Sequence, residues 1–224
     1  MGTLAANRKG YITGAQASGY QDAHGATTGV ASDSQTGDVN TAIQYFFSTG
    51  RGGGVHRFTR TFLHFDTSGI SAGVSGMSLV LTVTAGSSNV IGIKHTAGTS
   101  NGGELANDDF NNIDRSTIYT ASTSWASSGQ VTMTFTAAGL AAVIAQNDFN
   151  IALIGIEDQN AEEESPLEES GDISRGIAFG SAINLTYTDP ASGYTHKING
   201  LASASIGKVN TVATGSIGKI NTVD

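Results

Sequence analysis

Cysteine is absent from this chain of 224 residues, and proline occurs only twice. The lack of cysteine excludes disulfide bonds, thiolate nucleophiles and cysteine-based zinc or iron–sulfur sites. Charged side chains are also scarce, at 13% of the residues against roughly 25% in an average domain. The 11 basic and 19 acidic residues give a net charge of −8. Binding to nucleic acid is therefore not expected, because it needs a basic surface.

Long apolar stretches are missing as well. None approaches the ~20 residues that a membrane-spanning helix needs. Residues 1–14 also lack the apolar core of a secretion signal. We expect neither a membrane span nor a leader.

What the sequence does contain is alternation of apolar and polar residues, which is typical of half-buried strands. In residues 78–84, Leu79, Leu81 and Val83 fall on one face and threonines on the other. Residues 130–136 and 182–188 alternate in the same way, and residues 149–156 are apolar on both faces, as in a central strand. A short helix is predicted from Leu140 to Gln146. These patterns predict an all-β fold, an antiparallel jelly-roll β-sandwich over residues 41–189 with one short helix.

Two stretches look irregular. Residues 1–40 are rich in glycine, and we expect an extended arm that lies on a partner. Residues 157–169 hold seven acidic side chains and are expected to form a solvated loop. Arg60, inside an apolar strand, is expected to pair with a buried or edge carboxylate, for which Asp66 is the nearest candidate.

After Pro190 the composition changes. A phrase of Lys, Ile or Val, and Asn recurs every 11 residues, starting at Lys197, Lys208 and Lys219. It could form a helix with a right-handed supercoil or short strands that turn at the asparagines. Neither form buries its own apolar side chains. Residues 190–224 are therefore predicted to be a docking tail, with these residues at the interface: Ile198, Leu201, Ile206, Val209, Val212, Ile217, Ile220 and Val223.

Candidate ligand-binding residues are few. The oxygen-rich side chains of Asp108, Asp109 and Asp158 could hold a structural calcium ion. The single tryptophan, Trp125, could stack on a sugar ring or anchor the sandwich. No catalytic motif with a fitting context occurs, so we expect no enzymatic activity and no cofactor other than calcium.

Part of the chain resembles a known family. The segment from Arg60 to Asp66, the turn Ser68-Gly69-Ile70 and the strands at 78–83 and 183–188 resemble DNRLRE-type jelly-roll modules. The tail is similar to phrases that end many structural proteins of tailed bacteriophages, especially of marine and cyanobacterial hosts. The resemblance implies a component of the virion surface.

Two hypotheses follow. The first is a non-enzymatic virion protein, such as a capsid decoration protein, that assembles through its tail. Its partners would be major capsid, neck or tail subunits and further copies of itself, with a trimer favoured. The second is a carbohydrate-binding or host-adhesion module of a tail or neck fibre, whose partner would be a glycan on the host surface.

Overall fold

The computed structural model describes residues 1–34, 41–48, 54–70, 73–86, 88–96, 104–125, 128–145, 147–160, 173–189, 208–209 and 212–213. Its strands are β1 (Gly2–Ala5), β2 (Arg8–Gly14), β3 (Gly29–Ser34), β4 (Thr41–Ser48), β5 (Val55–Asp66), β6 (Ser75–Gly86), β7 (Ser88–His95), β8 (Ile113–Ile118), β9 (Thr123–Trp125), β10 (Gly129–Thr134), β11 (Asp148–Gly155), β12 (Ile173–Thr188), β13 (Lys208–Val209) and β14 (Val212–Ala213). Its helical segments are α1 (Tyr20–His24), η2 (Asn107–Asn111), α2 (Ala137–Ala145) and α3 (Ile156–Asn160).

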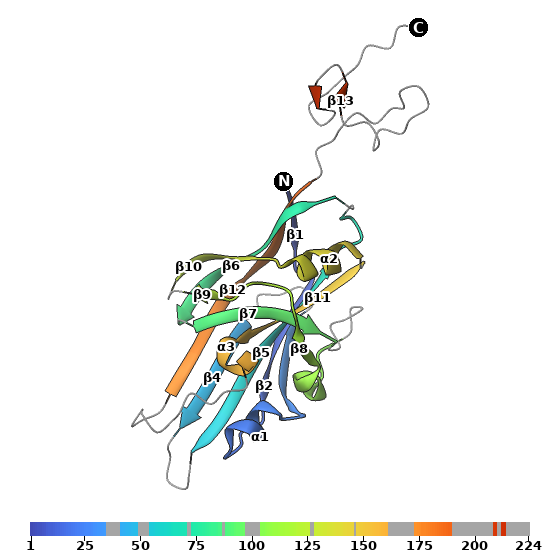
Figure 1. The fold of residues 1–224 in the computed structure, drawn as a ribbon. Helices are drawn as coiled ribbons and strands as arrows, with labels where there is room; N and C mark the ends of the chain where they lie inside the picture. Colours follow the sequence, from blue (N-terminus) through green and yellow to red (C-terminus); the bar gives the residue numbers. More distant parts are fainter. Residues whose placement is uncertain are drawn as a thin grey trace.

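The fold is all-β, and every strand pairing is antiparallel. The main sheet runs in the order β10-β6-β12-β4-β5-β11-β7-β8, with β1 on β12, β2 on β5, β3 on β2 and β9 on β7 (Figure 1). The long strands β5 and β12 each have more than two partners because different parts of one edge pair with different strands. This arrangement lets the sheet fold over, so that its two halves face each other.

The main hydrophobic core lies between the two halves. It joins Leu79 and Leu81 of β6 and Leu185 of β12 to Leu63 of β5 and Ile151 of β11. The predicted alternation in β6 is confirmed, because Leu79, Leu81 and Val83 are buried whereas Thr82 and Thr84 are exposed. The central position of residues 149–156 is confirmed too, since β11 pairs with both β5 and β7.

The N-terminal region differs from the prediction. Instead of an arm, it supplies β1, β2, α1 and β3, so the sandwich begins at residue 2 rather than at residue 41. The edge of β5 that β2 occupies would otherwise leave backbone groups without partners. Glycine obscured the strand pattern, yet one of these glycines is needed. A Cβ at Gly14 would lie 2.5 Å from Cζ of Phe110.

The predicted helix is present as α2. It begins three residues earlier than expected, after Thr136, whose Oγ1 accepts a hydrogen bond from the Gly139 backbone N–H at 3.1 Å. Such an N-terminal cap satisfies a donor that the helix itself cannot pair. No helix in the described part of the chain is long and apolar enough to cross a membrane.

The first and last strands of the sandwich lie side by side. Gly2 of β1 pairs with Tyr187 of β12, and the terminal amino group lies 3.7 Å from the Asp189 carboxylate. Beyond this point, β13 and β14 form a two-stranded sheet of their own, with Val209 opposite Val212. For these four residues of the second repeat, the structure contains strands rather than a helix.

Candidate functional site

A second hydrophobic cluster covers the outer face of the half that contains β5, β11 and β7. The segments α1, η2 and α3 lie over this face and leave its side chains buried (Figure 1). The buried members are Ile12, Tyr20, Ala23, Tyr45, Phe47, Phe58, Phe62, Ile91, Ile93, Leu105, Phe110, Ala152 and Ile154. Arg60 of β5 lies among them and has no exposed surface.

The Arg60 guanidinium connects all three segments. Its Nε donates to Oδ2 of Asp158 in α3 at 2.7 Å, and Nη2 donates to Oδ1 of the same carboxylate at 2.9 Å. Nη1 donates to the Phe110 carbonyl in η2 at 2.7 Å, and Nη2 also donates to the His24 carbonyl in α1 at 2.8 Å. The planar, five-donor group of arginine suits this fork, which a lysine could not reproduce.

The ring of Phe110 adds a further contact. It lies with its centroid 3.8 Å from Cζ of Arg60, close enough for a cation–π interaction. Gly14 of β2 leaves the space that this ring occupies. Burial lowers the pKa of Arg60, against the opposing effect of the Asp158 charge, yet an arginine remains protonated at any physiological pH.

Asp158 receives two further donors. Nη2 of Arg115 in β8 donates to its Oδ1 at 2.9 Å. Nε2 of His24 donates to its backbone carbonyl at 2.8 Å and lies 3.2 Å from Oδ1. Burial alone would raise the pKa of the Asp158 carboxyl, but the charge of Arg60, hydrogen bonds from His24 and Arg60, and the charge of Arg115 outweigh it. The net effect holds that pKa well below its usual range, so Asp158 stays ionised.

Two further hydrogen bonds join α3 to α1 and β8. Tyr20 of α1 donates its hydroxyl to the Glu157 carbonyl at 2.7 Å, and Nε2 of Gln159 donates to the Arg115 carbonyl at 2.8 Å. The segment 157–160, predicted as part of a solvated loop, is therefore a helical turn whose central carboxylate is 3% exposed. Residues 161–169 of the predicted loop lie outside the described residues.

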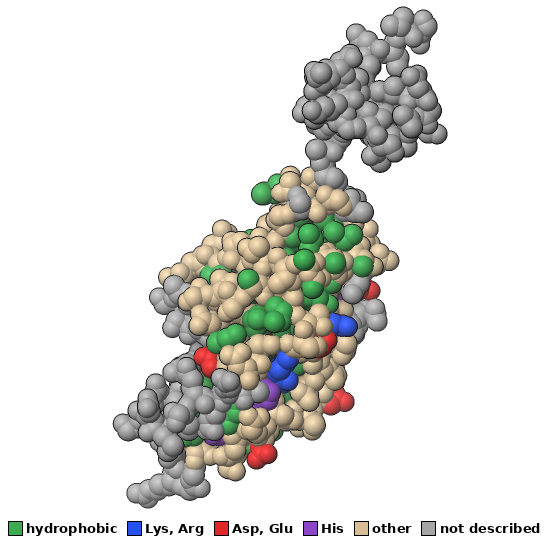
Figure 2. Space-filling view, in the orientation of Figure 1, with side chains coloured by type: hydrophobic (Ala, Val, Ile, Leu, Met, Phe, Trp, Pro, Cys, Tyr) green, Lys and Arg blue, Asp and Glu red, His purple; other side chains and the backbone are tan. Residues whose placement is uncertain are grey.

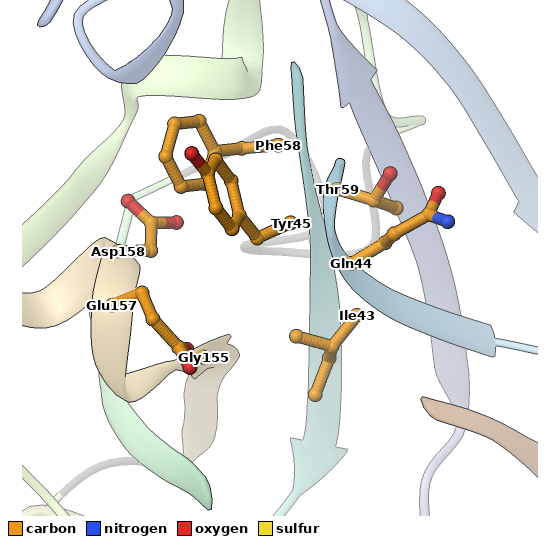
Figure 3. A pocket seen from close by; sticks show the side chains of 8 residues that line it. All are labelled: Ile43, Gln44, Tyr45, Phe58, Thr59, Gly155, Glu157 and Asp158. Carbon is orange, nitrogen blue, oxygen red and sulfur yellow. The ribbon is translucent and has the colours of Figure 1, made fainter. Parts of the chain in front are cut away.

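Beside this charge centre lies a small recess lined by residues of β4, β5 and α3. Figure 3 shows Asp158 on one side of it and the rings of Tyr45 and Phe58 on the other. The two rings stack with centroids 5.0 Å apart, and Tyr20 meets Phe58 edge-on at 5.2 Å. The recess has room for little more than a water molecule, so it does not fit a sugar ring or a similar substrate.

Chemically, this arrangement is suited to holding the structure together. An acid catalyst needs a carboxyl group with a raised pKa, whereas Asp158 is held ionised. Both oxygens of Asp158 already accept hydrogen bonds from cations, which opposes calcium binding there. The centre therefore connects β5, β8, α1, η2 and α3.

The predicted calcium ligands are not brought together. Asp108 is exposed in η2. Asp109, in the same segment, accepts from the Ala106 N–H at 2.9 Å and from Nδ2 of Asn112 at 2.7 Å. Asp158 is occupied by Arg60 and Arg115. Among the residues that the structure describes, no three His, Asp or Glu side chains are grouped so as to hold a metal ion.

The predicted partner of Arg60 is wrong, although the expectation of a carboxylate is confirmed. Asp66 is exposed and accepts hydrogen bonds from the backbone and hydroxyl of Ser68. The true partner lies 98 positions further along the chain. The alternation of β5 does place Arg60 on the face of Phe58 and Phe62, but nothing in the sequence around Asp158 marks it as buried.

The other candidate residues are placed as follows. Trp125 ends β9, where its backbone pairs with that of Ser88 on β7. Val209 and Val212 are cross-strand neighbours in the β13–β14 pair. The remaining predicted interface residues lie outside the described part of the chain: Ile198, Leu201, Ile206, Ile217, Ile220 and Val223. Comparison with protein-family models, curated proteins and solved structures finds no match to this chain.

The buried pair can be tested by a double-mutant cycle on unfolding. Asp158→Asn leaves the Arg60 charge buried without a counterion and is expected to lower the free energy of unfolding by about 3–5 kcal/mol. The pair Arg60→Met and Asp158→Asn should cost less than the sum of the single changes. As a control, Asp66→Asn on the surface should change stability by less than about 1 kcal/mol. Strict additivity, or an equal effect at Asp66, would contradict the pairing.

A second buried group predicts a pH dependence. His95 of β7 is 2% exposed, and its Nε2 donates to the Leu63 carbonyl at 3.1 Å. Burial lowers its pKa to about 4, against the Leu63 hydrogen bond and with the help of the His64 charge. Because an unfolded histidine binds a proton near pH 6.5 and the folded one does not, stability is complete above pH 6.5 and falls as the pH drops to about 4.

The expected loss over this window is about 3 kcal/mol, measured by denaturant unfolding at several pH values. His95→Gln keeps a donor for Leu63 but cannot titrate, and it should remove this part of the slope. The Asp158 carboxyl acts at lower pH, because its contribution begins to be lost only below about pH 4. A wild-type slope that His95→Gln leaves unchanged would contradict the assignment.

Proposed function

We propose that this chain is a non-enzymatic structural protein of a bacteriophage virion, with a jelly-roll domain on the particle surface that is attached through residues 190–224. The observation that carries the proposal is the tail repeat. Three 11-residue copies pair a lysine with an apolar residue, and units of this size need a neighbour to cover their apolar side chains.

The described strands support a separation between a folded sandwich and an attachment tail. Residues 2–188 supply the strands of the main sheet, and β1 closes the edge of β12 from which the tail departs. Leu185 of β12 is completely buried, only a few residues before the tail starts. Among the residues that the structure describes, the core between the two sheet halves is built from strands of the sandwich and from residues packed against them.

The proposal also rests on how the charged residues of the sandwich are used. Arg60 donates to Asp158 and to backbone carbonyls, so both charges are used inside the domain.

The similarity of the strand at 60–66 to DNRLRE-type modules, and of the tail to the ends of phage structural proteins, points to the same role.

The tail can be tested in the full-length protein. Replacing Ile198, Val209 and Ile220 by Asp removes the apolar residue after each repeat lysine. Each such side chain is worth about 1.5–3 kcal/mol when buried, so incorporation into particles should fall by more than about tenfold. The amount of protein in gradient-purified particles is measured by quantitative mass spectrometry.

The matched control places the same three charges on polar tail positions, Ser205, Ser216 and Thr222, and should be incorporated like the wild type. Equal incorporation of the apolar-site variant would contradict attachment through the tail. Absence of the wild-type protein from purified particles would contradict the virion role itself.

A further inference from the structure

The helix α2 presents an unusual surface. Its nine residues are all apolar or glycine, in the sequence Ala-Ala-Gly-Leu-Ala-Ala-Val-Ile-Ala. Only Gly139 and Val143 are buried, whereas Ala137, Ala138, Ala141 and Ala145 are exposed. A surface helix normally turns charged or polar residues toward solvent. Figure 2 shows apolar side chains gathered on the surface over this helix.

Acidic groups lie just beyond the C-terminal end of α2. Asp148 begins β11 three residues after the helix ends, and its register partner on β5 is Asp66. Asp66 is exposed and the Asp148 side chain is 42% exposed, with one oxygen 3.1 Å from Nε2 of His64. The backbone carbonyls at a helix C-terminus add partial negative charge, so this end of α2 favours a cation.

The tail has the complementary chemistry. Residues 190–224 contain three lysines and one aspartate, whereas residues 1–189 contain 8 basic and 18 acidic side chains. In each repeat the lysine is followed directly by isoleucine or valine. A basic, apolar segment therefore has to find cover next to an acidic domain, and the apolar helix with carboxylates at its end offers both contacts.

We propose that the tail repeats of one copy dock on α2 of a neighbouring copy, with a repeat lysine at Asp66 and Asp148 and the apolar residue after it on the outer face of α2. This inference rests on the proposed function and names the surface that receives the tail. A neighbouring copy is the occupant because the described tail strands, β13 and β14, pair with each other and not with the sandwich of their own chain. Head-to-tail contacts of this kind form a ring where the rotation between copies closes, and a trimer is one such ring.

The test uses two full-length variants and their mixture in sedimentation velocity. Ala141→Lys places a cation on the exposed face of α2, where lysine is a good helix former, and removes the receiving surface. The variant with Asp at 198, 209 and 220 removes the tail contact. The control Thr132→Lys puts the same charge on an exposed position of β10.

The wild type and Thr132→Lys should associate, and each of the other two variants should sediment as a single chain. Mixed in equal amounts, those two variants should form a 1:1 complex, because one still offers a tail and the other still offers α2. The association constant of each variant alone should fall at least about tenfold. Circular dichroism checks that each variant stays folded.

Three results would overturn the proposal. If the mixture stays as single chains, the tail is not received by α2 of another copy. If Ala141→Lys associates like the wild type while the tail variant does not, the tail docks elsewhere, and the proposed function survives without this surface. If the tail variant also associates like the wild type, the attachment role of the tail fails as well.

Discussion

The ion pair between Arg60 and Asp158 is the interaction on which the outer half of the structure depends. Taking two charges out of water costs several kcal/mol for each ion, and only good geometry with further hydrogen bonds offsets this. Here the fork of Arg60 meets both oxygens of Asp158, and backbone carbonyls of α1 and η2 accept its other donors. Three short segments that could not fold alone are thereby fixed over one face of a sheet.

The two hydrophobic clusters differ in what covers them. The inner cluster is stabilised by strands of both halves packing through leucine, isoleucine and phenylalanine. In the described part of the chain, the outer cluster is covered by three segments of five residues each, and Arg60 contacts all three of them. A defect at Arg60 would therefore expose aromatic residues such as Phe58 and Tyr20 without disrupting the inner core.

The sequence predicted the parts of the fold in which side chains alternate strictly. Leu79, Leu81 and Val83 show this, since their burial follows directly from a period of two. The N-terminal strands were missed because Gly10 and Gly14 dilute the pattern of β2, although Gly14 is there to admit Phe110. The sequence predicted Asp158 as a calcium ligand and not as the partner of Arg60, because a carboxylate in an acidic stretch resembles a solvated one, and only the fold brings it to Arg60. Pairings between distant residues of this kind cannot be read from local spacing.

The two ends of the sandwich have different roles in this account. In Figure 1, α1 lies at one end of the sandwich, whereas β1 and the last residues of β12 leave at the other, with α2 toward the same end. The charge centre stabilises the domain, whereas the apolar helix and the chain ends carry the assembly contacts that we propose. Because the two regions share few residues, changes in one should leave the other intact.

Amide hydrogen exchange of Asp158→Asn against the wild type tests the central claim most directly. If Arg60 and Asp158 hold α1, η2 and α3 together, amides of α1 and η2, such as those of Ala23 and Asp109, lose protection together with α3. The ladder between β6 and β12 keeps its protection. Loss of protection confined to α3 would show that α1 and η2 are held independently and would contradict the account.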